Sequence, residues 1–409
     1  MPPLLSVLLP TRNRLEYLRI AVQTVLRQSD PDWEIVVSDN DSQEDIAGYV
    51  ASLADERIRY VRTASLVPVT ENWNSALEHS AGRYVVMLGD DDGLLPGFVA
   101  MVRSLEERFA SPDVIYTGAC LFAYPGVMPG RPEGYAQPYS YARFLRGRDE
   151  PFVLEPRTAR RLVDEALGFR VRYGFNMQFA TVSRALIDRL SGRGPFFQSA
   201  FPDYYAMNAA FLAAHRIVVD PAERVAIGVT PKSYGFFHVN RREGEGKAFL
   251  GAAADDLTDD ALERAMLPGS NINAGWLSAM LSLTARYGDE YGLRADVRRF
   301  RMLQAEWVVE QHVAGEVGDA ELADLRERLT PRERRFWDAA AALARPLYRI
   351  TPDLGRRAVR HGLHRFVLRQ IPFWDPPCDV GYSTLLDLFE RRACAISSGT
   401  APITASTPT

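Results

Sequence analysis

Residues 82–92 have the sequence GRYVVMLGDDD, an apolar run that ends in three consecutive carboxylates. The part Tyr84–Leu88 has the length and composition of a buried β-strand. Three adjacent carboxylates repel one another and are costly to bury without partners, so one interpretation of Asp90–Asp92 is a solvated acidic turn. The alternative is a cation site, because Mg²⁺ or Mn²⁺ binds through one or two carboxylates together with substrate phosphates.

The chain before this stretch alternates between strand and helix patterns. Buried-strand patterns occur at Leu4–Leu9, Trp33–Val37 and Ile58–Val61. Apolar residues at helical spacing lie between them, which predicts a parallel sheet with right-handed crossovers. Ligands of such sheets bind beyond the carboxyl ends of the strands, so we expect the polar clusters that follow three strands to converge. These clusters are residues 11–14, residues 39–41 and residues 90–92.

Composition and missing motifs exclude several classes of protein. No GxGxxG or GxxxxGK[ST] follows the first strand, which argues against a dinucleotide fold and a P-loop and leaves a metal as the candidate for holding phosphates. The formal charge of −4 implies no general polyanion-binding surface, and we expect no nucleic-acid partner. The three cysteines match no zinc or redox spacing, and no signal peptide or membrane span is evident. We expect a soluble, cytoplasmic protein.

Four segments stand out in the first hundred residues, in the order Val7–Arg14, Glu34–Ser42, Asn72–Leu77 and Gly82–Asp92. In this order and spacing they resemble the family 2 glycosyltransferases of the GT-A fold, which are inverting enzymes with nucleotide-sugar donors. The resemblance is dense over residues 4–100, looser over 170–250 and absent beyond. It implies an α/β fold, a Rossmann-like, mostly parallel sheet flanked by helices, followed here by an all-helical C-terminal extension.

The strand signals end near residue 250, where we place a domain boundary. The expected organisation is a GT-A catalytic domain, a helical C-terminal domain and a disordered tail, at residues 1–250, 251–396 and 397–409. Within the first, the resemblance implies a nucleotide-binding half over 1–110 and an acceptor half over 111–250.

The resemblance also implies roles for the polar clusters. Asp39 would accept a hydrogen bond from the nucleotide base, most often N3–H of uracil; the alternative is an Asx-turn after the strand. Asp90 would contact the ribose. Asp91 would coordinate Mn²⁺ or Mg²⁺ on the diphosphate, and Asp92 would be a further ligand or only cap or orient its neighbours. The remaining expected donor-binding residues are Thr11, Arg12, Asn13, Arg14, Asp41 and Asn74.

Two departures from the family pattern concern the donor. Arg12 stands where many members have an aromatic residue that stacks on the base; arginine can also stack, which leaves the base open. Gly89 stands where many members have the first acid of a D-x-D-D pattern. Asp90 and Asp91 are therefore the functional minimum of the acidic run.

An inverting transfer needs a carboxylate that takes the proton of the acceptor hydroxyl. Asp203 matches the family's base position; the alternative is a carboxylate that only favours the helix N-terminus. Asn176 and Gln178 lie where the family places residues that bind the acceptor, and ordinary polar groups at a strand end are an equal alternative.

The segment that begins at Pro231 resembles the loop that closes over the donor in this fold. His238 is a candidate metal ligand there, although a lone histidine is more often structural. Lys232 and Lys247 are the only lysines of the chain, and we expect Lys232 to contact the donor diphosphate.

Seven arginines and one aspartate lie within residues 345–371, and Ile371–Trp374 adds aromatic side chains. A basic amphipathic helix of this kind can lie on an anionic bilayer, so residues 345–376 are a candidate for peripheral contact with the inner face of the cell membrane. The alternative is a helix that packs on its own domain with a solvated arginine face.

The sequence therefore favours a metal-dependent inverting glycosyltransferase. Its expected partners are a nucleotide-diphosphate sugar, with UDP preferred, and a glycan or lipid-linked acceptor of bacterial surface polysaccharide synthesis. A nucleotidyltransferase would normally carry a phosphate loop rich in glycine and lysine after the first strand, which Thr11–Arg14 is not. A non-catalytic scaffold or binding protein remains the alternative, and Asp203 distinguishes it, because a binding module needs no base.

Overall fold

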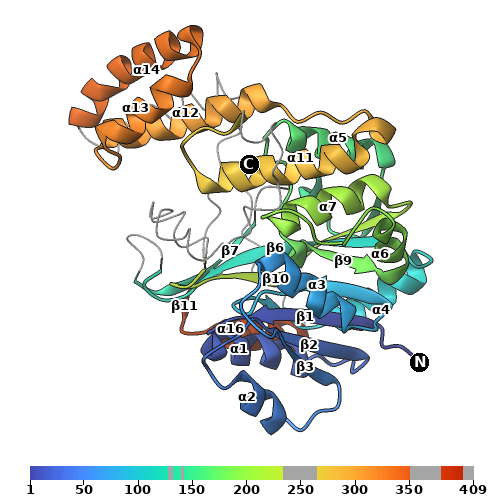
Figure 1. Ribbon diagram of the computed structural model, residues 1–409. Coiled ribbons are helices and arrows are strands. Elements are labelled where there is room, and N and C mark those ends of the chain that lie inside the picture. The colour runs from blue at the N-terminus through green and yellow to red at the C-terminus, as the bar shows by residue number, and fades with distance from the viewer. Residues whose placement is uncertain (128–131, 140–141, 234–264, 351–378, 399–409) are drawn as a thin grey trace. The chain divides into compact units, whose positions relative to one another are not determined.

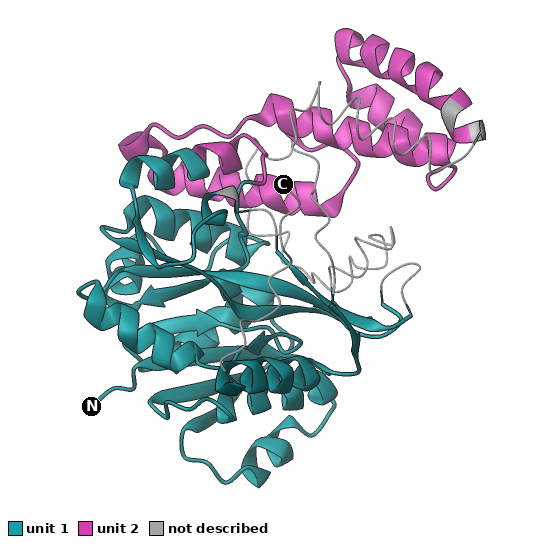
Figure 2. Cartoon of the chain, turned by 180° about the vertical axis from the view of Figure 1, so that it is seen from behind, with its two compact units in different colours: residues 1–163, 172–254, 375–409 teal, residues 164–171, 255–374 magenta. Residues whose placement is uncertain are grey.

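The computed structural model describes residues 1–127, 132–139, 142–233, 265–350 and 379–398. The chain forms two compact units, shown in different colours in Figure 2. The first unit comprises residues 1–163, 172–254 and 375–409, and the second comprises residues 164–171 and 255–374.

One β-sheet runs through the first unit, with helices packed on it (Figure 1). Its strands are β1 (Leu5–Thr11), β2 (Trp33–Asp39), β3 (Ile58–Arg62), β4 (Tyr84–Met87), β5 (Gly93–Leu94), β6 (Val114–Ala123), β7 (Gly134–Pro138), β8 (Phe152–Leu154), β9 (Ala180–Ser183), β10 (Ile217–Val229) and β11 (Asp379–Tyr382). Their order is β11-β7-β6-β9-β4-β1-β2-β3, and β10 pairs with β5, β6 and β8. The predicted α/β fold with flanking helices is confirmed.

Parallel pairing is concentrated in the N-terminal half of the sheet. Strands β3, β2, β1 and β4 are parallel, as are β6 and β10, whereas β9, β7 and β11 run antiparallel to their neighbours. The sheet is therefore mixed. Thr11 lies opposite Asp39, and Leu8 lies opposite Met87, so β1, β2 and β4 end at the same edge.

The helices of the first unit are α1 (Leu15–Leu26), α2 (Ile46–Ser52), α3 (Val69–Glu78), α4 (Phe98–Arg108), α6 (Arg184–Ser191), α7 (Pro202–Ala213) and α16 (Leu385–Ser398), and α5 (Pro156–Leu167) begins in this unit. Strands β1, β2 and β4 are buried at almost every residue, as expected for parallel strands covered on both faces. The apolar stripe of α1, with Leu18, Val22 and Val25 fully buried, follows the helical spacing of the sequence.

The C-terminal segment returns to the first unit. Strand β11 pairs with β7, and α16 packs beside α1 (Figure 1). Leu385 and Leu388 are fully buried in a cluster with Phe122 and Tyr124. A Cβ atom at Gly93 would lie 2.4 Å from Cδ2 of Leu385, so this helix approaches the sheet closely at a residue without a side chain.

The organisation beyond residue 250 thus differs from the expectation. We expected one helical domain over 251–396, whereas Asp379–Tyr382 forms a strand and residues 375–409 belong to the first unit. The expected tail begins inside α16, which ends at Ser398, and the rest of that tail lies outside the described residues. The physical reason is nonlocal pairing: β11 finds its partner strand more than 240 positions earlier in the chain.

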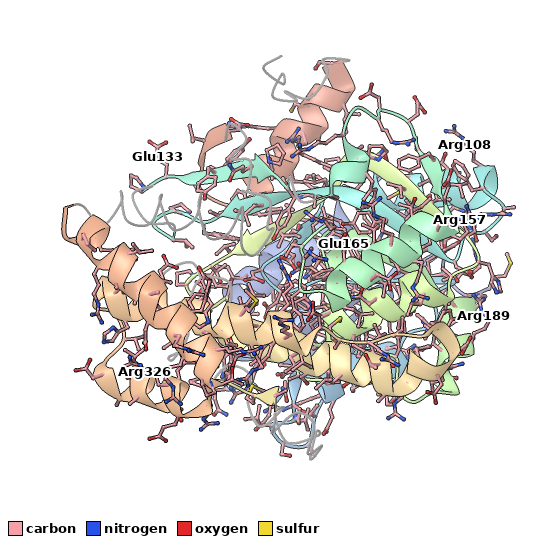
Figure 3. The ribbon with its side chains drawn as sticks, turned by 90° about the horizontal axis from the view of Figure 1, so that it is seen from above. Arg108, Glu133, Arg157, Glu165, Arg189 and Arg326 are labelled. Carbon is pink, nitrogen blue, oxygen red and sulfur yellow. The ribbon has the colours of Figure 1, made fainter. Side chains whose placement is uncertain are left out.

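The described part of the second unit is helical, as the sequence predicts. Its helices are α11 (Asn271–Tyr291), α12 (Val297–Ala314), α13 (Asp319–Arg328) and α14 (Pro331–Ile350). An apolar cluster that includes Val308, Leu325 and Trp337 joins the last three. Arg326 of α13, labelled in Figure 3, pairs with Asp338 of α14 at 2.5 Å. Of the helices in the described ranges, none has the length and apolarity needed to span a membrane.

Candidate active site

The polar clusters at the ends of β1 and β4 meet, as predicted. Oγ1 of Thr11 donates a hydrogen bond of 2.8 Å to Oδ2 of Asp90. Arg14, one turn further on at the start of α1, places its guanidinium Nη1 2.7 Å from Oδ1 of Asp90 and 3.4 Å from Oδ2 of Asp91. Asp90 and Asp91 are only 4% and 8% exposed. The two carboxylates are therefore not a solvated turn but a buried cluster with a cationic partner.

The charges of this cluster depend on one another. Burial by itself lowers the pKa of Arg14, but the carboxylates of Asp90 and Asp91 outweigh it and raise that pKa above its ordinary value. Burial also raises the pKa of Asp90, while Arg14 opposes this increase. Arg14 thus supplies the positive charge that lets two acids stay together in a region of low dielectric constant.

Asp91 is held by the segment that follows β10. The hydroxyl of Ser233 donates a short hydrogen bond to Oδ2 of Asp91, and Oγ1 of Thr230 donates one of 3.3 Å. A Cβ atom at Gly228 would lie 1.8 Å from the backbone oxygen of Asp91, so only glycine lets β10 pass this close. Among the described residues, the groups that contact the Asp91 carboxylate are the side chains of Ser233, Thr230 and Arg14.

Asp92 differs from its two neighbours, because it is bonded largely by backbone amides. Its carboxylate accepts hydrogen bonds from the N–H groups of Gly89 and Gly228, both at 2.8 Å, and from Nε2 of Gln178 at 2.6 Å. Burial, followed by the charge of Asp91, raises the pKa of Asp92 to about 7. Asp92 is therefore bonded both to its own turn, at Gly89, and to β10, at Gly228.

Asp39 lies at the same edge but is completely buried. Its Oδ1 accepts a hydrogen bond from the backbone N–H of Ser42, and its Oδ2 accepts bonds from Tyr60 at 2.7 Å and Arg62 at 3.2 Å. The bond from Ser42 is local, but it comes from three residues further along the chain, one more than in the Asx-turn that was the alternative for Asp39. A nucleotide base would reach this carboxylate only after Tyr60 or Arg62 moves.

The other expected donor-binding residues are spread along the same edge. Asn13 and Asp41 both have left-handed backbone conformations, with φ of 53° and 55°, and they stand in the loops after β1 and β2. Asp41 pairs with Arg62 at 2.9 Å. Lys232 donates a hydrogen bond of 3.1 Å from Nζ to the backbone oxygen of Asn13, and Arg12 is exposed. Lys232 therefore lies beside the loop that follows β1.

Asn74 does not join the carboxylate cluster. Nδ2 of Asn74 donates a hydrogen bond of 2.9 Å to the backbone oxygen of Phe197, and Oδ1 of Asn74 accepts one of 3.2 Å from the backbone N–H of Phe197. Thr70 of the same helix donates a hydrogen bond of 2.7 Å to the oxygen of Ser199. Helix α3 thus holds the segment that leads into α7, and Asn74 has a positioning role in this arrangement.

Asp203 lies in the first turn of α7, after Pro202, and is partly buried. Burial raises the pKa of Asp203 to about 7, while the hydrogen bond from the backbone N–H of Tyr204, at 3.0 Å, opposes the increase. A carboxylate with a pKa near 7 can accept a proton at neutral pH, and this is the property that a general base needs.

The two residues expected on the acceptor side are placed by a short 3₁₀ turn at Met177–Phe179. Asn176 precedes this turn and is partly buried, whereas Gln178 is buried and bonded to Asp92. Oε1 of Gln178 is buried and has no hydrogen-bond partner among the residues that the structure describes. Gln178 therefore keeps one unused acceptor while it is tied to the acidic run.

Sequence patterns did not indicate four residues of this site: Tyr60, Tyr124, Thr230 and Ser233. Thr230 and Ser233 form a hydroxyl pair 2.9 Å apart, and the T-x-x-S spacing at the start of the expected loop was the available signal. Tyr60 sits in the middle of a strand and Tyr124 follows one, which are ordinary places for tyrosine. No local pattern distinguishes them.

A three-ligand metal site is not preformed. Among the residues that the structure describes, no three His, Cys, Asp or Glu side chains are grouped so as to hold a metal ion. His238 lies outside those residues. The cluster fits a cation held through Asp91 and substrate phosphates, since one or two carboxylates are the usual protein contribution to Mg²⁺.

Comparisons with known proteins agree with the resemblance. Residues 6–161 match the model of the family described as Glycosyl transferase family 2. The GalNAc(5)-diNAcBac-PP-undecaprenol beta-1,3-glucosyltransferase of Campylobacter jejuni is 35% identical over 112 residues, 26% of this chain and 36% of its own. The Escherichia coli enzyme UDP-Glc:alpha-D-GlcNAc-diphosphoundecaprenol beta-1,3-glucosyltransferase WfgD is 28% identical over 89 residues, 22% of this chain and 35% of its own.

Among solved structures, that of Staphylococcus aureus TarS, residues 1–349, covers 93% of this chain and 96% of its own, with 16% identity and a TM-score of 0.46. The chain spans little more than a third of the length of the two curated relatives. The residues that match the family model, 6–161, include Arg14 and Asp90–Asp92 but not Thr230 or Ser233.

Proposed function

We propose that this protein, whose residues 6–161 match the model of glycosyl transferase family 2, transfers a sugar from a nucleoside-diphosphate donor to a hydroxyl group of a glycan or lipid-linked acceptor, with inversion. The main support is the buried cluster of Arg14 with Asp90 and Asp91 at the carboxyl edge of the sheet. A cation paired with acids at this edge is suited to a ligand that carries phosphates and hydroxyl groups.

In the proposed complex the donor lies along this edge. Its base is near Asp39 and Arg12, its ribose is near Asp90, and its diphosphate is near Arg14 and Lys232. Thr11, Asn13 and Asp41 support the loops around it, and Asn74 holds the segment before α7. The printed name of the relative WfgD includes UDP-Glc, which favours UDP as the nucleotide here.

We further propose that Asp91 holds Mn²⁺ or Mg²⁺ together with the donor phosphates, and that His238 is a second candidate ligand. A divalent cation in this place would neutralise the charge of the departing diphosphate. Asp92 would orient the turn through the amides of Gly89 and Gly228 rather than bind the ion directly.

Asp203 is the proposed base. The oxygen of the acceptor hydroxyl attacks the anomeric carbon, the bond from this carbon to the phosphate oxygen breaks, and the hydroxyl proton passes to the Asp203 carboxylate. The nucleoside diphosphate leaves with the bonding electron pair. The raised pKa of Asp203 suits this proton transfer. Asn176 and the unused Oε1 of Gln178 are available to hydroxyl groups of the acceptor.

The names of the relatives support a proposal for the acceptor class. Both curated relatives have undecaprenol-linked glycans in their printed names, so we propose a lipid-linked acceptor at the cytoplasmic face of a bacterial membrane, in surface polysaccharide assembly. The candidate membrane segment 345–376 includes the end of α14, and its residues 351–376 lie outside the described part. Deletion of residues 345–376 should abolish binding to anionic liposomes, and unchanged binding would reject membrane contact through this segment.

The test of the proposed function is a panel of nucleotide sugars with Mn²⁺ and an undecaprenyl-diphosphate glycan, in which nucleotide release is measured with and without chelator. Release with one donor, dependent on acceptor and on metal, is the expected result. The Asp203→Asn variant should bind the same donor but release nucleotide far more slowly than wild type. Failure of all donors to react, with biological activity retained in Asp203→Asn, would instead favour the non-catalytic scaffold.

A further inference from the structure

Tyr124 directly follows β6 and lies beside the segment that holds Asp91. Its backbone N–H donates a hydrogen bond of 3.1 Å to the oxygen of Val229, the residue before Thr230. Its ring contacts the ring of Tyr17 edge-on, with centroids 5.2 Å apart. Tyr17 is in the first turn of α1, and its N–H bonds to the backbone oxygen of Arg14 at 3.0 Å. The residue is therefore enclosed by two elements that build the acidic site.

The hydroxyl group of Tyr124 is buried and has no hydrogen-bond partner in the described part of the chain. Tyr124 as a whole is 8% exposed, and its ring belongs to the apolar cluster under α16. A buried hydroxyl without a partner is unfavourable, and most such groups in folded proteins are paired. A phenylalanine would fill the same space without this penalty, so the hydroxyl calls for an explanation.

The surroundings indicate what would bind this hydroxyl. Burial, followed by the charge of Asp91, raises the pKa of Tyr124, which keeps the phenol protonated and able to donate. Arg14 lies 3.4 Å from Oδ2 of Asp91, and Nζ of Lys232 lies 6.0 Å from the centre of the Tyr17 ring. A hydroxyl donor near Asp91, the residue that we propose to hold a cation together with the donor phosphates, is suited to an oxygen atom of a phosphate group.

The order of the sheet decides which part of the donor lies here. Asp39, the proposed contact of the base, ends β2, whereas Tyr124 follows β6, on the other side of β4 and its aspartates. A nucleotide that extends from β2 across the end of β4 reaches Tyr124 with its phosphates, not with its base.

We propose that Tyr124 is a donor-binding residue whose phenol hydroxyl donates a hydrogen bond to a phosphate oxygen of the bound nucleoside diphosphate. This inference rests on the proposed function, because it takes a nucleoside diphosphate as the ligand. It adds a residue that the sequence patterns did not indicate.

The test compares the Tyr124→Phe variant of the full chain with wild type. Affinity for UDP, GDP, ADP and dTDP is measured by titration calorimetry with Mn²⁺, and thermal unfolding is followed without nucleotide. Tyr49→Phe is the matched control, since the hydroxyl of Tyr49 is also buried without a partner, and Arg19 rather than an aspartate acts on its pKa. We expect Tyr124→Phe to weaken binding of the preferred nucleotide about 10-fold or more, and Tyr49→Phe to bind like wild type.

Without nucleotide, Tyr124→Phe should unfold at the same or a higher temperature than wild type, because no hydrogen bond within the protein is lost. Nucleotide binding equal to wild type would overturn the inference, and so would a clear loss of stability without nucleotide. If wild type binds none of the four nucleotides, both the proposed function and this inference fail; wild-type binding that Tyr124→Phe leaves unchanged rejects the inference alone.

Discussion

Nη1 of Arg14 lies 2.7 Å from Oδ1 of Asp90, and both side chains are less than 10% exposed. This pair connects the start of α1 with the turn after β4, two elements that are 76 positions apart in the chain. Arg14 also contacts the backbone oxygen of Lys232, so three separate segments meet at one guanidinium group. The pair is therefore central to both the stability and the chemistry of the site.

Replacing Arg14 with glutamine should lower the free energy of unfolding by about 3–5 kcal/mol, because it leaves Asp90 buried without its cation. Urea unfolding at pH 7 measures the change. Arg27→Gln is the control, since Arg27 forms an exposed ion pair with Glu390 at 2.8 Å, and it should cost about 0–1 kcal/mol. Equal losses in both variants would contradict the structural role of Arg14.

Asp91→Asn should lower kcat/KM by about 100-fold or more, since it removes the charge that would hold the cation at the donor phosphates. Binding of Mn²⁺, followed by electron paramagnetic resonance, should weaken in parallel. Asp55→Asn is a suitable control, because Asp55 pairs with Arg57 at the surface. An Asp91→Asn variant with normal kcat/KM and normal Mn²⁺ affinity would rule out this role.

Asp203→Asn should lower kcat by about 10²–10⁴-fold while leaving donor affinity unchanged. The pKa of Asp203 is raised to about 7, and the base must be ionised, so wild-type kcat should rise with pH through about 7. The residual activity of the variant should lack this rise. A variant that keeps both the rate and the pH profile would show that another group takes the proton.

The same carboxylate should make stability depend on pH. Because the folded-state pKa of Asp203 is about 7 and its ordinary value is 3.8, folded Asp203 holds a proton that the unfolded chain has lost between these values. The contribution of Asp203 to the free energy of unfolding is therefore greatest below about pH 4 and falls as the pH rises to about 7. We expect Asp203→Asn to match wild type in urea unfolding at pH 4 and to be more stable at pH 8. Equal stability at both pH values would mean that the folded protein does not raise this pKa.

The packing of α16 in the first unit can be tested by shortening a side chain on its buried face. Leu388→Ala should cost about 2–5 kcal/mol of the free energy of unfolding, because Leu388 is completely buried in the cluster with Phe122 and Tyr124. Ile396→Ala on the same helix is the control, since Ile396 is 60% exposed and should cost much less. A small effect of Leu388→Ala would contradict this packing.

Local sequence patterns were sufficient to predict much of the fold. The apolar runs that become β1, β2 and β4 are buried on both faces, and this burial is visible in the sequence as uninterrupted hydrophobic stretches. The strand–helix alternation then placed Thr11, Asp39 and Asp90 at one edge, because parallel strands share a direction. The helices of the second unit followed from the 3.6-residue period in the same way.

Orientation within the site was decided by tertiary contacts. Three adjacent residues of the same type have different partners. Asp90 pairs with Arg14, Asp91 accepts a hydrogen bond from Ser233, and Asp92 accepts one from the backbone N–H of Gly228. These partners come from elements that are far apart in the chain. No spacing rule within the acidic run distinguishes the three roles.

The sequence by itself thus determined which elements form and which of their ends carry polar groups, because periodicity and strand direction are local properties. Only the tertiary structure decided that the last helix belongs with the first unit and that Tyr124 stands beside Asp91. Both results depend on pairing and packing between distant segments, and the free energy of such contacts is not encoded in either segment alone.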